Sequence, residues 1–322
     1  MFPRNILILH AGALGDCVLA LDLVRVLKRA WQHSTVTMAA RSPIVRWAAR
    51  HGLLDEGLSL DQIGAAHWYN QESSIPARCL ELLRRFDAVI SFLGGPEEPI
   101  TRRLQELSGR DVFAVDPQPT EETLQSRTHI VEQWAAAIRR LEFDLRSEVP
   151  STAAIDDRSR EALAGDLRQR IGAQHERIVM VHPGSGGLRK CCPIEAMEQL
   201  VAALQLRGRN VGWMIGPDEV ERFGPDYARR LEKTALVLCE ESVEAAADLV
   251  AGADAFIGFD AGMTHVAAIA GVRTVAIFGP TDPRVWGPLG PFCSVVGFPA
   301  SNGGVEEWVS EVVSCLTARQ VD

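Results

Sequence analysis

The sequence predicts an α/β protein built from two doubly wound parallel sheets. Short apolar runs alternate with longer helix-like segments, and this alternation stops between Phe143 and Arg177 and then starts again. The chain has 322 residues, 47% of them hydrophobic, which suits two domains of about 150 residues with a core each. Ligands of such sheets bind beyond the carboxyl ends of the strands, so we expect the site in the cleft between the two domains.

The first half of the chain opens on its clearest strand, Asn5–His10, a continuously apolar run typical of a parallel strand covered on both faces. A turn with Gly12 and Gly15 follows, and Asp16–Ala30 then carries apolar residues at helical spacing. The other elements predicted in this half are strands at 35–39, 87–92 and 112–115, and helices near 43–51, 76–85, 100–108 and 126–141.

The second half follows a loop-like stretch, residues 147–157, and a polar helix over 158–171. Its predicted strands are 178–182, 210–215, 235–238, 255–258 and 274–278, with a helix over 193–206. These patterns place the domains at 1–155 and 156–304. The closing segment, 305–318, is amphipathic. Its apolar stripe consists of Val305, Trp308, Val309, Val312, Val313 and Leu316.

Composition excludes several classes of protein. The formal net charge is −9, from 33 basic and 42 acidic residues, which argues against a nucleic-acid partner. Seven cysteines form no C-x-x-C pair, so the sequence predicts neither a zinc site nor a disulfide framework. No apolar run reaches the ~18 residues of a membrane span, and the first residues lack the features of a signal peptide. We expect a cytoplasmic protein that is able to touch the inner face of a membrane.

The first candidate for chemistry is Asp16, which follows the turn His10-Ala-Gly-Ala-Leu-Gly-Asp16. One interpretation is structural: the carboxylate caps the helix that begins there. The other is a general base at the mouth of the cleft. The turn is not the G-x-G-x-x-G fingerprint of dinucleotide-binding enzymes, so a dehydrogenase loses support.

The second candidate is the glycine-rich loop after the strand at 178–182, with the sequence HPGSGGLRKCCP from His182 to Pro193. Its glycines expose backbone N–H groups, and Arg189 and Lys190 add positive charge, which favours a phosphate-binding loop over an ordinary turn. Only three of the 33 basic residues are lysines, so a lysine in this position is notable. The loop is not a Walker motif, because no Ser or Thr follows Lys190 to bind magnesium.

Two further turns carry carboxylates. Glu219 follows the strand at 210–215 and suits either the acidic first turn of a helix or a bond to ribose hydroxyls. Asp260 follows the strand at 255–258 and precedes a helix rich in small residues, GMTHVAAIAG, whose first N–H groups suit a pyrophosphate. His265 on that helix is either a core histidine or a ligand contact. A Phe-Gly-Pro-Thr-Asp-Pro turn follows the next strand.

These motifs, in this order over nearly the whole chain, resemble the ADP-heptose:lipopolysaccharide heptosyltransferase family, which is glycosyltransferase family 9. The resemblance implies the GT-B fold, with two Rossmann-like domains facing each other across a cleft and a C-terminal helix, residues 305–322, that packs back on the first domain. It implies transfer of a heptose from an ADP-sugar to a hydroxyl of the lipopolysaccharide inner core. The chain has no D-x-D metal motif, so we expect inverting chemistry without a metal or other cofactor.

The resemblance also implies roles for individual residues. Asp16 would be the catalytic base. Gly184, Ser185 and Lys190 would contact the donor phosphates, and Glu219 would bind the ribose. Asp260 would bind the hydroxyls of the donor sugar. Gly262 and His265 would contact the pyrophosphate, and their neighbour Thr264 would also belong to the donor site. Two residues depart from the family pattern: Cys192 replaces an aromatic residue before Pro193, and Ala261 replaces a threonine.

Other interpretations remain open from the sequence. Candidate contacts for an anionic acceptor are Arg41, Arg46 and Arg50 near Trp47, Arg84–Arg85 and Arg102–Arg103, each of which also suits a solvated helix face. The acceptor site is therefore not assigned. Alternative functions are another nucleotide-sugar enzyme of the same fold, such as an epimerase or a capsule or protein transferase, and a non-catalytic sugar-nucleotide-binding homologue.

Overall fold

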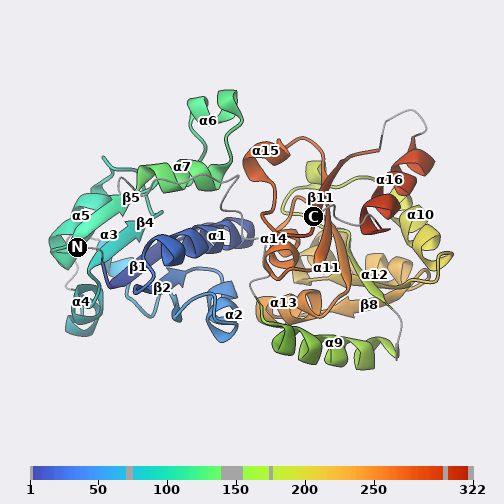
Figure 1. The fold of residues 1–322 in the computed structure, drawn as a ribbon, viewed down its shortest axis with the longest axis horizontal. Helices are drawn as coiled ribbons and strands as arrows, with labels where there is room; N and C mark the ends of the chain where they lie inside the picture. Colours follow the sequence, from blue (N-terminus) through green and yellow to red (C-terminus); the bar gives the residue numbers. More distant parts are fainter. Residues whose placement is uncertain (1–2, 70–74, 139–154, 174–176, 300–303, 318–322) are drawn as a thin grey trace. The chain divides into compact units, whose positions relative to one another are not determined.

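The computed structural model divides into two compact units, Met1–Val149 and Pro150–Asp322 (Figure 1). It describes residues 3–69, 75–138, 155–173, 177–299 and 304–317. Most of the predicted loop at 147–157 lies outside the described residues, and so does residue 318 of the predicted closing helix. Each unit is a parallel sheet with helices packed on it, as the sequence predicts.

The first unit contains five parallel strands in the order β3-β2-β1-β4-β5. Their bounds are β1 Asn5–His10, β2 Thr35–Ala40, β3 Glu56–Ser59, β4 Ala88–Ser91 and β5 Asp111–Ala114. The helices are α1 Leu14–Ala30, α2 Ile44–Arg50, α3 Ala66–Tyr69, α4 Ala77–Arg84, α5 Pro99–Ser108, α6 Glu121–Ser126 and α7 Ile130–Ala137. The last five residues of β1 are buried, which explains the apolar run that predicts this strand.

Two predictions for this unit need correction. The helix predicted over 126–141 begins only at Ile130, as α7, because the chain turns at Arg127, whose φ of 55° is left-handed. A separate helix, α6, ends at Ser126 before this turn, and residues 139–141 of the predicted helix lie outside the described residues. The strand β3 was not predicted, since Glu56–Ser59 is short and only half-buried at the edge of the sheet.

The second unit contains six parallel strands in the order β11-β10-β9-β6-β7-β8. Their bounds are β6 Ile178–His182, β7 Asn210–Ile215, β8 Leu236–Cys239, β9 Ala255–Phe259, β10 Arg273–Phe278 and β11 Cys293–Gly297. The α-helices are α9 Asp157–Ile171, α10 Ile194–Gln205, α11 Pro217–Phe223, α12 Pro225–Leu231, α13 Val243–Ala251, α14 Gly262–Ile269, α15 Pro283–Trp286 and α16 Val305–Thr317. A 3-10 turn covers Leu188–Lys190.

The position of α16 differs from the expectation that the closing helix packs on the first domain. Trp308, Val312 and Leu316 are buried in one apolar cluster with residues of α10 and of the second sheet. The Trp308 indole also donates a hydrogen bond to the carbonyl of Gly297 in β11, at 2.8 Å. The stripe is therefore buried within the second unit, and Figure 1 shows α16 beside α10.

The topology of each sheet identifies where a site can form. The first sheet is wound outward in both directions from the pair β1 and β4, and the second from the pair β6 and β9. Chains leaving such a central pair at the carboxyl ends diverge and leave a crevice between them. Asp16 follows β1, and Asp260 follows β9, so both carboxylates lie at such a point in their own unit. Among the described residues, no helix is long and apolar enough to cross a membrane.

Candidate active site

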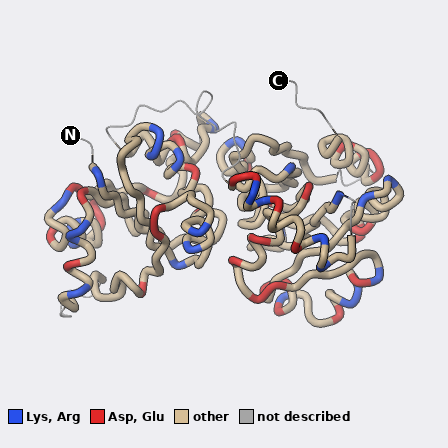
Figure 2. The backbone as a smooth tube through the Cα atoms, turned by 60° about the horizontal axis from the view of Figure 1, so that its bottom comes forward, with Lys and Arg blue, Asp and Glu red and all other residues tan. Residues whose placement is uncertain are grey.

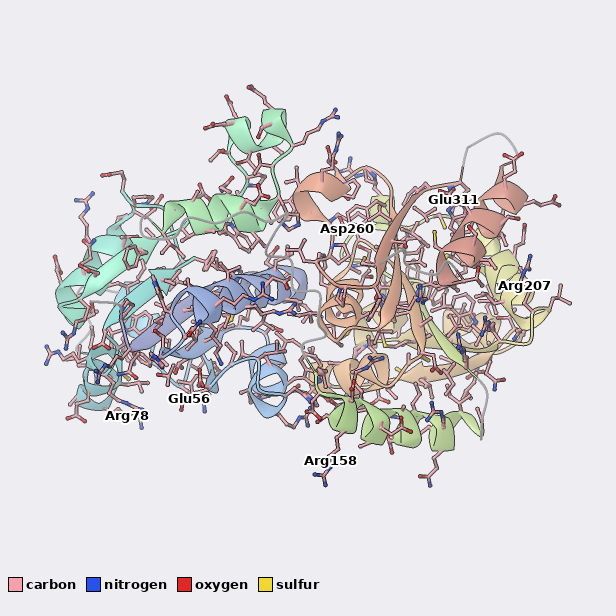
Figure 3. The ribbon with its side chains drawn as sticks, viewed as in Figure 1. Glu56, Arg78, Arg158, Arg207, Asp260 and Glu311 are labelled. Atoms are coloured by element: carbon pink, nitrogen blue, oxygen red, sulfur yellow. The ribbon has the colours of Figure 1, made fainter. Side chains whose placement is uncertain are left out.

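Three of the predicted donor-binding residues meet at the carboxyl edge of the second sheet. The Lys190 ammonium lies 2.6 Å from Oδ2 of Asp260, and the Ser185 hydroxyl donates to the Asp260 carbonyl oxygen at 2.5 Å. These residues are about 70 positions apart in sequence and converge because β6 and β9 are neighbours in the sheet. Asp260, labelled in Figure 3, and Ser185 are buried, whereas the Lys190 side chain is 35% exposed. The ion pair fixes the ammonium at the rim of the site.

Two residues complete this cluster that were not among the predicted donor-binding residues. The Thr281 hydroxyl donates to the same Oδ2 of Asp260, also at 2.6 Å. The Arg222 guanidinium donates to the Ser185 carbonyl oxygen at 2.5 Å. Thr281 belongs to the Gly-Pro-Thr turn after β10, and its position just after a strand could have identified it as a site residue from the sequence. Arg222 lies on α11, and no local sequence pattern links it to the glycine-rich loop.

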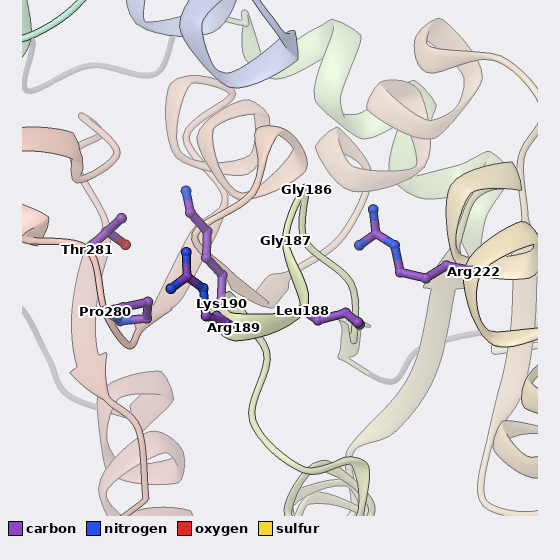
Figure 4. Close-up of a pocket in the computed structure, with 8 residues that line it drawn as sticks. All are labelled: Gly186, Gly187, Leu188, Arg189, Lys190, Arg222, Pro280 and Thr281. Carbon is purple, nitrogen blue, oxygen red and sulfur yellow. The ribbon is translucent and has the colours of Figure 1, made fainter.

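A pocket of about 630 Å³ opens beside this cluster (Figure 4). Its lining residues are Gly186, Gly187, Leu188, Arg189, Lys190, Arg222, Pro280 and Thr281. Three of these side chains are cationic, and Figure 4 shows the Lys190 side chain between Thr281 and the glycines of the loop. The pocket therefore combines positive charge with backbone that no side chain covers, which suits an anionic ligand with several oxygens.

Glu219 lies in a second, tighter cluster at the end of β7. Its Oε2 accepts the N–H of Gly216 at 2.8 Å, and its Oε1 lies 3.5 Å from Nε2 of His182. The expected position in the first turn of a helix is confirmed, because Glu219 is the third residue of α11. Burial opposes ionisation of this carboxyl, but the contacts with His182 and Gly216 outweigh it, so the pKa of Glu219 lies below its usual value.

The loop approaches Glu219 so closely that only glycine fits at position 184. A Cβ atom built on Gly184 would lie 1.9 Å from Oε1 of Glu219. By contrast, Cβ atoms on Gly186 and Gly187 would meet nothing within 4 Å. The glycines of this loop therefore have different roles: Gly184 permits close packing, while Gly186 and Gly187 border the pocket.

The predicted residues of α14 are less accessible. The Thr264 hydroxyl donates to the carbonyl of Phe259 at 2.6 Å, and both Thr264 and His265 are buried. Gly262 is the first residue of the helix and is half-buried. The backbone N–H groups at this helix start remain suited to a phosphate, since the first turn of a helix has no intrahelical acceptors for them.

In the first unit, Asp16 is the third residue of α1, because the helix begins at Leu14, two positions before the start that the sequence predicts. Its Oδ2 accepts the N–H of the cap residue Ala13 at 3.1 Å. This arrangement matches that of Glu219, since in both units a carboxylate in the first turn binds the N–H three residues before it. Asp16 is half-buried, so its carboxylate is also accessible to solvent.

The arginines considered for an acceptor lie at different places in the first unit. Arg41 directly follows β2 and its N–H binds the carbonyl of His10, so it lies at the same edge of the sheet as Asp16. Arg84 and Arg85 come shortly before β4, at the opposite edge. Arg102 donates to the carbonyl of Glu97, a bond local to the start of α5. Figure 2 shows basic and acidic residues interspersed in both units.

The described residues contain no group of three or more His, Cys, Asp or Glu side chains arranged to bind a metal ion. Three cationic side chains, Arg189, Lys190 and Arg222, line the pocket at the carboxyl edge of the second sheet.

Several solved structures have the same fold as this chain. The chain is similar to Escherichia coli ADP-heptose LPS heptosyltransferase II, with a TM-score of 0.73 and 16% identity over 98% of this chain and 99% of that one. A family 9 glycosyl transferase from Veillonella parvula gives a TM-score of 0.72 and 16% identity over 98% and 97%. The E. coli heptosyltransferase WaaC with ADP gives 0.67 and 20% over 97% and 100%. No curated protein matches the sequence significantly.

The two Rossmann-like units thus have the architecture of GT-B glycosyltransferases, as the sequence predicts. The sequence model of glycosyltransferase family 9 (heptosyltransferase) matches residues 119–304, which is more than half of the chain. The protein is a glycosyltransferase and belongs to this family.

Proposed function

We propose that the protein transfers a heptose from an ADP-sugar to a hydroxyl group of the lipopolysaccharide inner core, with inversion at the anomeric carbon and without a metal ion. The observation that carries this proposal is the pocket at the carboxyl edge of the second sheet, lined by Arg189, Lys190 and Arg222. The family supports a heptosyl donor. Structures of the E. coli heptosyltransferase WaaC contain ADP and ADP-2-deoxy-2-fluoro heptose, which supports an adenosine diphosphate sugar in particular.

The second unit would bind the donor and stabilise the leaving group. Breaking the bond between the anomeric carbon and the diphosphate leaves negative charge on the ADP oxygens, and preorganised cations stabilise such charge. Lys190 already pairs with Asp260 at 2.6 Å, so a diphosphate would share or displace that partner. Asp260 and Thr281 would then be available for sugar hydroxyls, and Glu219 for the ribose.

The first unit would supply the base. As the acceptor oxygen bonds to the anomeric carbon, its proton must move to a nearby group, and Asp16 is the candidate at the carboxyl edge of the first sheet. Its Oδ2 accepts the N–H of Ala13, which orients the carboxylate that would take the proton. Substitution of Asp16 by Asn preserves the shape and removes the basic oxygen.

The test has two parts. Calorimetry with ADP-, UDP- and GDP-sugars should show tightest binding for the ADP-sugar, and incubation of ADP-heptose with a heptose-free lipopolysaccharide core should give a product one heptose heavier. Asp16→Asn should bind donor normally and lose about 10²–10⁴-fold in turnover. Preference for a UDP- or GDP-sugar would refute the donor, and near-normal turnover of Asp16→Asn would refute the base. Loss of activity in EDTA that magnesium restores would refute the metal-free chemistry.

A further inference from the structure

The last residue of β1, His10, lies beneath the turn that connects β1 to α1, the helix that carries Asp16. Its side chain is fully buried, and its ring packs against Phe92 and Trp134 at centroid distances of 4.8 and 6.3 Å. Its Nδ1 accepts a hydrogen bond from the N–H of Gly12 at 3.0 Å. The side chain thus bonds to the backbone of the turn two residues further on.

This bond requires a neutral imidazole. Burial lowers the pKa of His10 to about 4, so Nδ1 keeps its lone pair at neutral pH, whereas a protonated ring would present N–H groups at both nitrogens. The neighbouring Cys17 thiol lies 3.7 Å from Nδ1 and from the Gly12 carbonyl oxygen. Burial raises its pKa to about 12, so it is also neutral. The cluster beneath the turn carries no charge at neutral pH that would compete with the Asp16 carboxylate.

The turn is confined between His10 and Asp16. A Cβ atom on Gly12 would lie 2.5 Å from Cε1 of His10 and 2.8 Å from Oδ2 of Asp16, so the glycine fills the space between ring and carboxylate. The next residue, Ala13, donates its N–H to the same Oδ2. A displacement of Gly12 would therefore move the donor that orients the carboxylate.

Packing alone does not explain a histidine here. In the part of the chain that the structure describes, Nε2 of His10 is buried and has no hydrogen-bond partner. With Nδ1 accepting, Nε2 carries the proton, and a buried donor without an acceptor destabilises a fold. An apolar side chain would avoid that cost but would not accept the Gly12 N–H. The feature that the histidine adds is the acceptor.

We propose that His10 is a positioning residue for Asp16: its Nδ1 fixes the turn at Gly12 and Ala13, and the turn fixes the carboxylate. This proposal rests on the proposed function of Asp16 as the base. His10 does not touch the substrate in this scheme, and acts only through the geometry of the turn.

The experiment compares His10→Leu, which removes the acceptor, with His10→Asn, whose amide oxygen takes a place close to that of Nδ1. With ADP-heptose and the heptose-free core as substrates, His10→Leu should lower kcat by about 10–100-fold, the usual effect of misplacing a reacting group by about 1 Å. The donor KM should stay within about twofold, because the donor residues lie in the other unit. His10→Asn should recover most of the lost kcat.

Two further measurements separate positioning from general damage. In the Asp16→Asn background, His10→Leu should cause no additional loss, because both changes remove the same function. Amide hydrogen exchange over residues 11–17 should be faster in His10→Leu than in the wild type and near normal in His10→Asn. The matched control is His129→Leu, since Nδ1 of His129 accepts the N–H of Val131 at 3.3 Å in the same pattern, at the start of α7. Its kcat should stay near that of the wild type.

Each outcome decides the proposal. Normal kcat in a folded His10→Leu protein, or a loss that adds fully to that of Asp16→Asn, would overturn it. A wild-type protein without transferase activity would instead refute the proposed function, and the exchange measurement would then decide whether His10 positions the turn. Unchanged exchange in His10→Leu would show that it does not.

Discussion

The substitution Gly184→Ala tests the packing of the glycine-rich loop on Glu219. The new methyl carbon would lie 1.9 Å from Oε1, 2.5 Å from Cδ and 2.7 Å from Cγ of Glu219. Non-bonded carbon contacts have an optimum near 3.5 Å, so the carboxylate must withdraw by roughly 1.5 Å. Such a movement breaks the bond to the Gly216 N–H and separates the carboxylate from His182.

The expected loss follows from these contacts. Overpacking a buried position costs about 1–3 kcal/mol, which lowers Tm by roughly 2–4 °C for each kcal/mol in a unit of this size. If Glu219 binds the ribose, its displacement should also weaken ADP binding by about 10–100-fold, the equivalent of one charged hydrogen bond.

The measurements are thermal unfolding and calorimetric titration with ADP, each on Gly184→Ala and on Gly186→Ala. The second variant adds the same methyl group to the same loop, where its Cβ meets nothing within 4 Å. It should melt close to the wild type. Equal melting temperatures and equal ADP affinities for the two variants would refute the argument that Glu219 and the loop are packed at their limit.

Three further substitutions test other parts of the site and fold. Lys190→Ala should weaken ADP binding by about 10–100-fold and lower turnover, because it removes the cation nearest Asp260; unchanged titration and kinetics would exclude a phosphate role. Thr281→Val should lower kcat/KM by about tenfold, because it removes the 2.6 Å hydrogen bond to Asp260, and it should change the affinity for ADP little. A loss of ADP affinity with unchanged kcat/KM would contradict the assignment of Thr281 to the sugar end of the donor. Asp22→Asn addresses pH and stability: burial raises the pKa of Asp22 to about 7, against a partial offset from Arg25 at 3.4 Å. A carboxyl whose pKa is higher in the folded state favours folding at low pH, and this contribution is lost as the pH rises through about 7. Urea unfolding at pH 5 and pH 8 should therefore show wild-type stability falling relative to Asp22→Asn by about 1–3 kcal/mol, and a constant difference would refute the shift.

The sequence predicted the central strands best, because burial on both faces leaves a simple apolar run. β1 and β6 match their predicted bounds, Asn5–His10 and Ile178–His182. Edge strands β3 and β11 were not predicted, since they are short and only partly buried. Their existence depends on pairing with a neighbour more than on their own side chains.

The sequence predicted the site residues that follow strand ends, and it missed residues that reach the site from elsewhere in the fold. Asp260 and Lys190 were expected to bind the donor separately, and their direct ion pair depends on which strands are neighbours. Arg222 reaches the loop from a different helix, a contact that spacing alone does not reveal. The burial of Thr264, whose hydroxyl bonds to Phe259, also depends on how α14 packs on the sheet.

Because α16 completes the core of the second unit, each unit has an apolar interior formed from its own residues. We therefore expect unfolding to have two cooperative parts, so that a ligand that binds only the native form of one part stabilises that part alone. In a calorimetric scan, ADP should raise the transition of the half that ends in α16 and leave the other in place. A single calorimetric scan could thereby report which unit a given ligand binds, because the nucleotide and the acceptor would each raise the transition of a different unit.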